Sequence, residues 1–201
     1  MIKPQLYVFA GPNGAGKSSL SAEMIAPGTS VFDGDVEFQK LKRIFYDLDE
    51  DYIRLSVNDN IFPAWKHDVI NQGVDAAFET NFRTAEVINS VKQFVSRGYD
   101  SRLIFMGLDS VEASIDRVNL RVAKGGHDVS VENINYNYHY SLLNLGLFYN
   151  NFTSVHLYQN FQAPGELIKM TPLMTVVEGE IIEEVVYLPE WAKQFRLKLK
   201  G

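Results

Sequence analysis

The chain contains no cysteine, and nowhere does it approach the ~20 consecutive apolar residues of a membrane-spanning helix. Without cysteine there can be no disulfide, thiol nucleophile or thiolate metal site, so other polar side chains must supply any chemistry. Residues 1–3 lead directly into a strand pattern without the apolar stretch of a secretory signal. We therefore expect a cytoplasmic protein with no membrane association.

Positive charge is also scarce. The sequence has 19 Lys and Arg against 25 Asp and Glu, which gives a formal net charge of −6. Proteins that bind duplex nucleic acid neutralise its phosphates with a basic face. DNA or RNA is therefore disfavoured as a partner.

Apolar runs and helical patterns alternate along most of the chain. Leu6–Ala10 is a continuous apolar run, typical of a strand that is buried on both faces, and residues 17–24 have helical spacing. Further strands are predicted at 30–32, 75–78, 102–106 and 154–158, and further helices at 61–72, 84–96, 111–124 and 131–148. This alternation predicts an α/β fold of three layers, with a mainly parallel five-stranded sheet between helices.

The end of the chain has a different pattern. Short antiparallel strands are predicted at 167–170, 174–177 and 181–187, and a closing helix at 190–199. Pro172 and the pair Glu178-Gly179 separate these strands. With 201 residues, 46% of them hydrophobic, we expect a single domain over 1–201 in which residues 165–201 form a small β-rich tail.

One motif between the first predicted strand and helix binds phosphate in other proteins. Residues 11–18 read Gly11-Pro12-Asn13-Gly14-Ala15-Gly16-Lys17-Ser18, which is the complete Walker A spacing, and Ser19 follows. Its glycines let backbone N–H groups face phosphate oxygens, and the helix presents its positive end to them. The motif predicts a P-loop NTPase fold of the nucleotide kinase type. Lys17 would contact the β and γ phosphates of ATP, and Ser18 would ligate Mg²⁺.

Carboxylates follow two of the predicted strands. The second strand runs into Asp33-Gly34-Asp35, and the third runs into residues 79–83, which begin with Glu79. Ligands of open α/β sheets bind beyond the carboxyl ends of the strands, and a kinase needs a carboxylate beside the attacking hydroxyl. Asp35 and Glu79 are candidates for that chemistry. Asp33 is a candidate for the metal or, equally, for turn and helix-cap chemistry.

Two arginines lie four residues apart on a later helix. Arg117 and Arg121 share one face, and Gly125-Gly126-His127 follows. Phosphoryl transfer needs positive charge around the transition state, and a helix followed by a Gly-Gly hinge could supply it from a closing lid at about 110–148. The alternative is a solvated helix in which Asp116 pairs with nearby arginines, with His127 as a structural hydrogen-bonding residue.

Together these motifs resemble the zeta-toxin family of P-loop kinases, especially its short members without the long C-terminal extension. The matching segments are 10–19, 33–35, 79–80, 117–122 and 125–129. They extend from about Leu6 to Leu145, which is roughly the first two thirds of the chain. The phosphate loop is common to many kinases, whereas the last segments are more specific to this family.

The resemblance implies a role for each matching residue. It implies that Lys17 and Ser18 hold ATP and magnesium, and that Asp35 deprotonates a sugar hydroxyl. It places the remaining side chains near the reacting groups (Glu79), near the substrate (Thr80, Arg83) and on the phosphates (Arg117). The characterised toxins phosphorylate a UDP-activated amino sugar, which is one candidate acceptor here.

The chain also departs from the family. The family's acidic substrate-binding residue corresponds to Pro63 here, so the substrate can differ. A second phosphate-contacting arginine corresponds to about His127, so that Arg121 or His127 must replace it. Short relatives often carry a basic pair where this chain has Asn135-Tyr136, which removes positive charge from the expected lid.

These observations favour an ATP-dependent kinase that transfers the γ-phosphate to a hydroxyl of a small metabolite. Two other functions stay open: a nucleotide-dependent binding or switch protein with little transfer activity, and a kinase of nucleic-acid ends. A role as the toxin of a toxin–antitoxin pair, with a small antitoxin protein as partner, is compatible with the first function.

Overall fold

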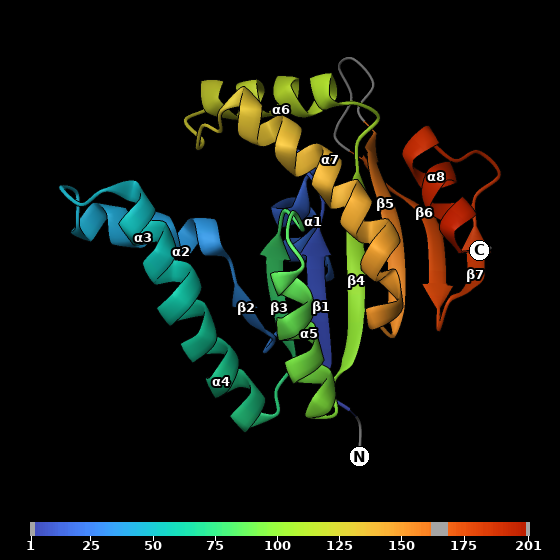
Figure 1. The fold of residues 1–201 in the computed structure, drawn as a ribbon, viewed down its shortest axis with the longest axis horizontal. Helices are drawn as coiled ribbons and strands as arrows, with labels where there is room; N and C mark the ends of the chain where they lie inside the picture. Colours follow the sequence, from blue (N-terminus) through green and yellow to red (C-terminus); the bar gives the residue numbers. More distant parts are fainter. Residues whose placement is uncertain (1–2, 162–168, 200–201) are drawn as a thin grey trace.

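The computed structural model describes residues 3–161 and 169–199. At its centre is a seven-stranded sheet with the order β2-β3-β1-β4-β5-β6-β7 (Figure 1). The strands are β1 (Gln5–Ala10), β2 (Ser30–Phe32), β3 (Ala76–Thr80), β4 (Asp100–Gly107), β5 (Ser154–Phe161), β6 (Lys169–Val177) and β7 (Glu180–Glu184). Strands β1 to β5 are parallel, and β6 and β7 join antiparallel at one edge, which confirms the predicted fold class.

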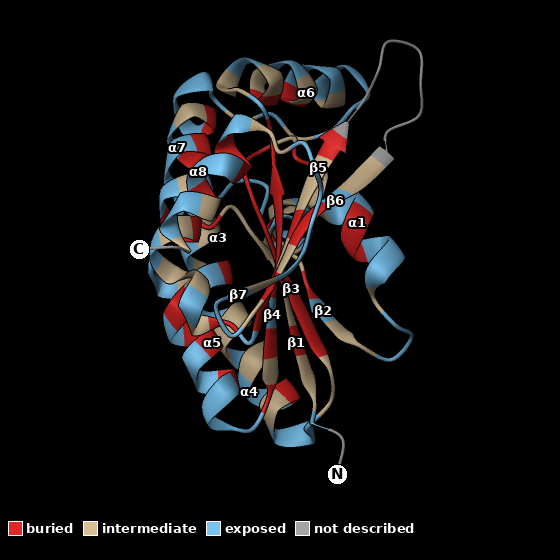
Figure 2. Ribbon diagram, turned by 90° about the vertical axis from the view of Figure 1, so that its right-hand side faces the viewer, coloured by how far each residue is buried: buried red, intermediate tan, exposed pale blue. Residues whose placement is uncertain are grey.

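Helices cover both faces of the sheet. They are α1 (Lys17–Met24), α2 (Gly34–Ile44), α3 (Glu50–Ser56), α4 (Phe62–Gln72), α5 (Glu86–Ser96), α6 (Val111–Ala123), α7 (Val131–Phe148) and α8 (Glu190–Lys198). A π-helical segment, η1 (Val57–Ile61), joins α3 to α4, and a 3-10 turn, η2 (Tyr149–Asn151), follows α7. Figure 2 shows α1 on one face of the sheet, and α4, α5, α7 and α8 on the other.

The central strand β1 shows why helices must pack on both faces of the sheet. Val8 and Phe9 are both fully buried although they point to opposite faces. Val8 belongs to the large core beneath α5 and α8, and Phe9 to the smaller core that includes Leu20 of α1. The run Leu6–Ala10 is continuously apolar because both faces of this strand are packed.

Two helices were not among those predicted from the sequence. The Asp33 side chain caps α2 by accepting hydrogen bonds from the amides of Asp35 and Val36, and Asp49 caps α3 in the same way. Only Phe38 of α2 and Ile53 of α3 are buried. Each helix is short and buries a single side chain, and the caps define where the helices begin.

The tail differs from its prediction in two respects. The sequence pattern predicts two strands separated by Pro172, whereas β6 is a single strand. Pro172 pairs with Tyr158 and Met174 pairs with Leu157, so the extra residue Leu173 forms a bulge. A bulge accommodates proline because the ladder of hydrogen bonds is already interrupted there. β7 ends at Glu184 rather than at 187, and residues 167–168 of the predicted tail lie outside the described residues.

Parallel pairing brings the carboxyl ends of the strands together. Ala10 at the end of β1 pairs with Thr80 of β3 and with Phe105 of β4, and Phe32 at the end of β2 pairs with Phe78. The segments that follow these strands therefore meet at one edge of the sheet. Helices α6 and α7 cross this edge (Figure 1). They make up most of the region 110–148, whose action as a lid stays a prediction.

Candidate functional site

The phosphate loop connects β1 to α1 with a backbone that requires glycine. Gly11 and Gly16 have φ angles of 139° and 95°, which side chains disfavour. A Cβ on Gly11 would also collide with the carbonyl oxygen of Met106, and one on Gly16 would collide with the side chain of Met170. No side chain caps the N-terminus of α1, so its first amides are available to phosphate oxygens.

Lys17 lies inside this loop. Its Nζ donates hydrogen bonds to the carbonyl oxygens of Gly11 and Pro12, at 2.9 and 3.0 Å, and to Oδ1 of Asn81 at 3.0 Å. The pKa of Lys17 is lowered from 10.5 to about 8, chiefly by burial and also by the charge of Arg121, whereas the charges of Glu79, Asp35 and Asp33 oppose the shift. The ammonium group is therefore poorly neutralised by protein, and an anionic ligand would stabilise it.

Glu79 closes the site opposite the loop. Its Oε2 accepts a hydrogen bond from the hydroxyl of Ser18, and its Oε1 accepts one from Ser21, both at 2.8 Å. Burial raises the pKa of Glu79, while the bonds from Ser21 and Ser18 lower it. The hydroxyl proton of Ser18 thus points to Glu79, which leaves the oxygen lone pairs available to a cation.

The two aspartates differ in their positions. Oδ1 of Asp33 accepts from the amides of Asp35 and Val36, at 2.9 and 3.2 Å, so the helix-cap alternative describes this oxygen correctly. Asp35 lies exposed in the first turn of α2. The charges of both residues act on the pKa of Lys17, so both lie within electrostatic reach of the phosphate loop. The structure thus brings Asp33, Asp35, Lys17 and Glu79 to the same edge, as the strand order predicts.

Arg117 packs against the outside of the loop. Its guanidinium donates to the carbonyl oxygen of Asn160, at 2.8 Å, and more weakly to that of Gly14, at 3.5 Å. Burial lowers its pKa, and the charge of Asp109 opposes the shift. In this conformation Arg117 supports the loop backbone, whereas the resemblance implies a contact with phosphates. That contact remains a prediction.

A buried amide pair holds the loop from the lid side, and sequence reasoning missed it. Asn137 on α7 donates from Nδ2 to Oδ1 of Asn13, at 2.7 Å, and both residues are buried. Ser114 on α6 donates from its hydroxyl to the carbonyl oxygen of Asn13. These partners lie 101 and 124 residues from Asn13, so no local pattern in the sequence could reveal them.

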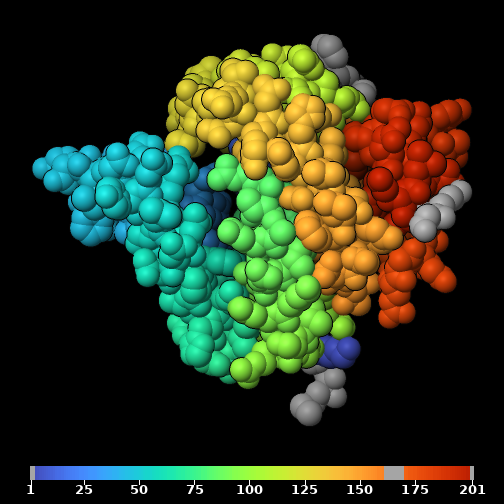
Figure 3. Space-filling view, viewed as in Figure 1, coloured from blue at the N-terminus to red at the C-terminus, as the bar shows by residue number. Residues whose placement is uncertain are grey.

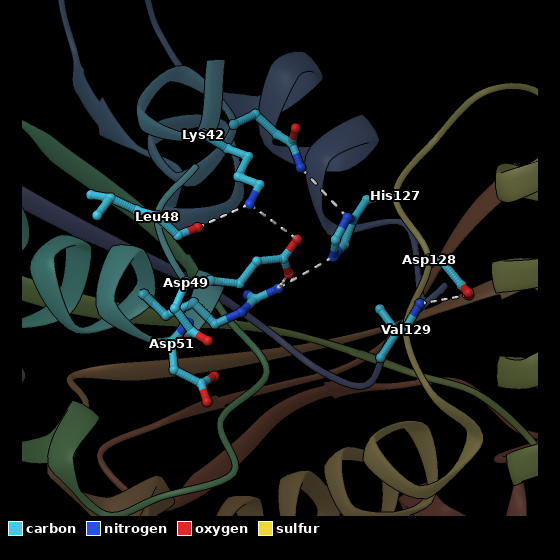
Figure 4. Close-up of polar contacts among 10 residues, drawn as sticks. Lys42, Leu48, Asp49, Asp51, His127, Asp128 and Val129 are labelled. Atoms are coloured by element: carbon cyan, nitrogen blue, oxygen red, sulfur yellow. Dashed lines mark hydrogen bonds and ion pairs between the residues drawn. The ribbon is translucent and has the colours of Figure 1, made fainter. Parts of the chain in front are cut away.

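Figure 4 shows where the turn after the Gly-Gly pair lies. The ring of His127 contacts Gln39 of α2 and Arg54 of α3, both at 3.5 Å. Arg121 donates to the backbone oxygen of His127 at 2.7 Å. Within the described residues, no hydrogen bond joins the His127 ring to the phosphate loop. Of the two candidates for a second phosphate contact, Arg121 is therefore the better placed, since its charge acts on Lys17.

The predicted substrate residues lie in the loop after β3. Thr80 uses its hydroxyl oxygen to accept from the amide of Phe82, at 3.0 Å, and so shapes this loop. Arg83 follows at the surface. Figure 3 shows a hollow between α3–α4 and the lid, with atoms of the N-terminal part of the chain visible in its floor.

A metal ion would find few protein ligands at this edge. Among residues 3–161 and 169–199, no group of three His, Asp or Glu residues is close enough to form a cation cage. Mg²⁺ usually keeps several waters and takes phosphate oxygens with one or two protein ligands, so a site made of Ser18 and a bound nucleotide suits it.

No helix in the described part of the chain is long and apolar enough to cross a membrane.

Comparison with known proteins supports the fold assignment. No family model matches the sequence. An uncharacterised protein of Haemophilus influenzae is 24% identical over 156 residues, which cover 69% of this chain and all of that protein. The AvrRxo1-ORF1:ORF2 complex with ATP contains a chain that superposes with a TM-score of 0.70 at 12% identity over 98% of this chain. This chain spans only 64% of that protein's length.

A second solved structure is that of the PezAT toxin–antitoxin system of Streptococcus pneumoniae. Its matching chain has a TM-score of 0.67 and 14% identity, covering 100% of this chain and 84% of its own length. The chain has a zeta-toxin-like P-loop kinase fold. The resemblance stated from sequence motifs is therefore confirmed at the level of the fold. The expected single domain and the role of each site residue stay predictions.

Proposed function

We propose that this protein is an ATP-dependent kinase that transfers the γ-phosphate of ATP to a hydroxyl group of a small molecule. The observation that carries the proposal is the bond of the Ser18 hydroxyl to Glu79 beside the buried ammonium of Lys17. The charges of Glu79, Asp35 and Asp33 compensate the burial of Lys17 only in part, which favours a loop that binds an anion over a merely structural one. An anion seated on α1 would satisfy both the lysine and the free amides.

The residues fit ATP with Mg²⁺. ATP would supply the phosphoryl group, and Mg²⁺ would supply positive charge that neutralises the phosphates. Lys17 would bind the β and γ phosphates, and Ser18 would ligate the cation through its free lone pairs. Glu79 would fix the orientation of Ser18, and Asp33 would hold a metal-bound water through Oδ2. Asp35 would accept the proton of the acceptor hydroxyl, as its oxygen attacks the γ-phosphorus and the bond to the β-phosphate breaks.

The outer residues would complete the nucleotide site. The loop amides from Gly11 to Ser19 would surround the phosphates, as in other P-loops. Arg121 would add positive charge beside the γ-phosphate, which is supported by the action of its charge on Lys17. Thr80, which follows Glu79 at the end of β3, and Arg83 in the loop after β3 would border the acceptor.

Labelled ATP tests this proposal. The protein would be incubated with γ-labelled ATP, Mg²⁺ and a pool of metabolites, and labelled products would be separated. We expect a labelled small molecule with the parent protein and none with Lys17→Met or Asp35→Asn. A parent protein that binds ATP but labels no acceptor from any pool would contradict the kinase function.

A second candidate is a nucleotide-dependent switch with little transfer activity. Two observations favour it: Arg117 is engaged by backbone carbonyl groups, and the ring of His127 contacts α2 and α3. If Arg117 and His127 keep these partners, they contribute less positive charge to the transition state of phosphoryl transfer. Nucleotide binding without turnover, accompanied by a change in lid protection during hydrogen exchange, would select this function.

The toxin role concerns the biology rather than the chemistry. The PezAT chain belongs to a toxin–antitoxin system, and the AvrRxo1 chain was solved with a partner. We include a small antitoxin protein as a partner in the proposal. Co-expression with a small protein encoded beside this chain, followed by copurification and relief of growth inhibition, would test it.

A further inference from the structure

Helices α2 and α3, with the turn between them, form an arm that projects from the rest of the molecule (cyan, at the left of Figure 3). Each helix buries a single side chain, Phe38 in α2 and Ile53 in α3. Residues 44–55 nevertheless include six large apolar side chains that are 45% to 80% exposed: Ile44, Phe45, Tyr46, Leu48, Tyr52 and Leu55. The arm therefore exposes more large apolar side chains than it buries.

The exposed apolar surface of the arm is large enough for a protein interface. An aromatic side chain has about 150–250 Å² of surface, so the six side chains together expose several hundred Å². A standard interface takes about 800 Å² from each partner, and apolar patches above a few hundred Å² are rare on monomeric proteins. Four of the six side chains lie at the tip, within residues 44–48, and Tyr52 and Leu55 share one face of α3. A partner that packs on the end of the arm can therefore cover them together.

Charges of both signs lie beside this apolar surface. Arg43 precedes the tip, Asp47 lies within it and Asp51 follows it, and all three residues are exposed. In the part of the chain that the structure describes, these three side chains form no ion pair and no side-chain hydrogen bond. The other basic side chains of the arm each contact a glutamate: Lys40, Lys42 and Arg54. The surface thus offers one cation and two anions that can pair with groups of another molecule.

A second copy of this chain satisfies both the apolar surface and the charges. In a dimer with two-fold symmetry both copies present the same surface, so a contact between two different residues occurs twice. Arg43 of each copy can then pair with Asp47 of the other, while the apolar tips cover each other. A partner with charge of only one sign would leave either Arg43 or the aspartates desolvated without a counter-charge, which is costly. The charge pattern therefore favours self-association.

We propose that the protein forms a two-fold symmetric dimer through its arms. The six apolar side chains lie at the centre of the interface, and Arg43 pairs with Asp47 across it. The arm also carries residues of the candidate site, since Asp35 lies in the first turn of α2 and Arg54 of α3 contacts the ring of His127. Dimerisation therefore restrains both helices at one side of the hollow. This association needs no nucleotide and is independent of the proposed kinase function.

Analytical ultracentrifugation tests the dimer. Sedimentation of the parent protein without nucleotide, from micromolar to millimolar concentration, should show a reversible equilibrium between monomer and dimer. Tyr46→Lys and Tyr52→Lys should each raise the Kd of the dimer about tenfold or more, because each places a charge in the apolar centre. A melting temperature close to that of the parent protein establishes that each variant is folded.

Tyr187 provides a matched control for these two variants. It is 88% exposed and lies between β7 and α8, away from the arm. Tyr187→Lys should therefore change the Kd by less than about twofold, as expected for a surface substitution outside an interface. If Tyr187→Lys abolishes the dimer instead, the contact lies on the tail and the proposal is wrong.

Exchanged charges test the two-fold arrangement. Arg43→Glu and Asp47→Lys should each weaken the dimer about tenfold, because like charges then face each other across the interface. An equimolar mixture of the two variants should associate nearly as well as the parent protein. In the mixed dimer the new glutamate of one copy faces the new lysine of the other, and the remaining pair is that of the parent protein.

Three other results would overturn the proposal. The first is a parent protein that stays monomeric up to millimolar concentration. The second is a Kd that Tyr46→Lys and Tyr52→Lys leave unchanged. The third is a mixture of Arg43→Glu and Asp47→Lys that associates no better than either variant alone.

Discussion

The buried ammonium of Lys17 makes nucleotide binding depend on pH. Without ligand, burial lowers its pKa to about 8. Phosphate oxygens should return the pKa well above 9, because they would supply the negative charge that the loop lacks. ATP binding should therefore take up a proton whenever the free protein has lost it.

The magnitude follows from the value of that pKa. The apparent Kd should increase by the factor 1 + 10^(pH − 8), which is about 1.1 at pH 7, about 2 at pH 8 and about 11 at pH 9. Affinity should thus fall about tenfold, or about 1.4 kcal/mol, from pH 7 to pH 9. At pH 8 about half a proton should be taken up for each ATP bound.

Calorimetry measures both quantities. Titrations at pH 7, 8 and 9, each in two buffers with different heats of protonation, give the Kd and the number of protons taken up. Phosphate groups of the nucleotide are largely ionised over this range and contribute little. Lys17→Arg is the matched control, because arginine keeps its charge and should remove the pH dependence.

The same titrations can refute the predicted loss of ATP affinity at high pH. A Kd that stays constant from pH 7 to pH 9, or a release of protons at pH 8, would show that Lys17 is fully charged in the free protein.

The same pKa shift affects the free energy of unfolding without ligand. Between about pH 8 and pH 10.5 the unfolded chain binds more protons, so stability should rise with pH relative to Lys17→Met.

Four other variants test the site. Asp35→Asn should keep ATP affinity and lower turnover about a hundredfold or more, whereas Asp33→Asn should weaken Mg²⁺-nucleotide binding or stability; the reverse result would exchange their roles. Ser21→Ala removes a bond that lowers the pKa of Glu79, so loss of activity on acidification should begin at a higher pH and the Mg²⁺ requirement should increase, unlike Ser96→Ala. Asn137→Ala should cost about 1–3 kcal/mol of unfolding free energy in denaturant, because Asn13 loses its buried donor. The control Asn135→Ala should cost little, because it removes only a solvent-exposed bond to the carbonyl oxygen of Val131 on the same helix.

The sequence by itself was enough to place the phosphate loop and the parallel strands. Both depend on local features: the glycine spacing from Gly11 to Lys17, and the apolar run of Leu6–Ala10. Parallel strands end at a common edge, so the approach of Glu79 to the loop also followed from the strand order. The caps were only partly predictable, since Asp33 was equally suited to a metal or to a helix N-terminus.

Only the tertiary structure decided which hydrogen-bond partners the polar side chains of this site have. The bond of Ser21 to Glu79 spans 58 residues, and that of Asn137 to Asn13 spans 124, so neither leaves a local pattern. Arg117 donates to a backbone carbonyl on β5, a partner that depends only on how α6 packs. Pro172 stays within one strand because its neighbour β5 permits a bulge at that position. Local patterns select the elements, whereas packing between distant segments selects the partners of each polar group, because a buried donor or acceptor must find one wherever the fold provides it.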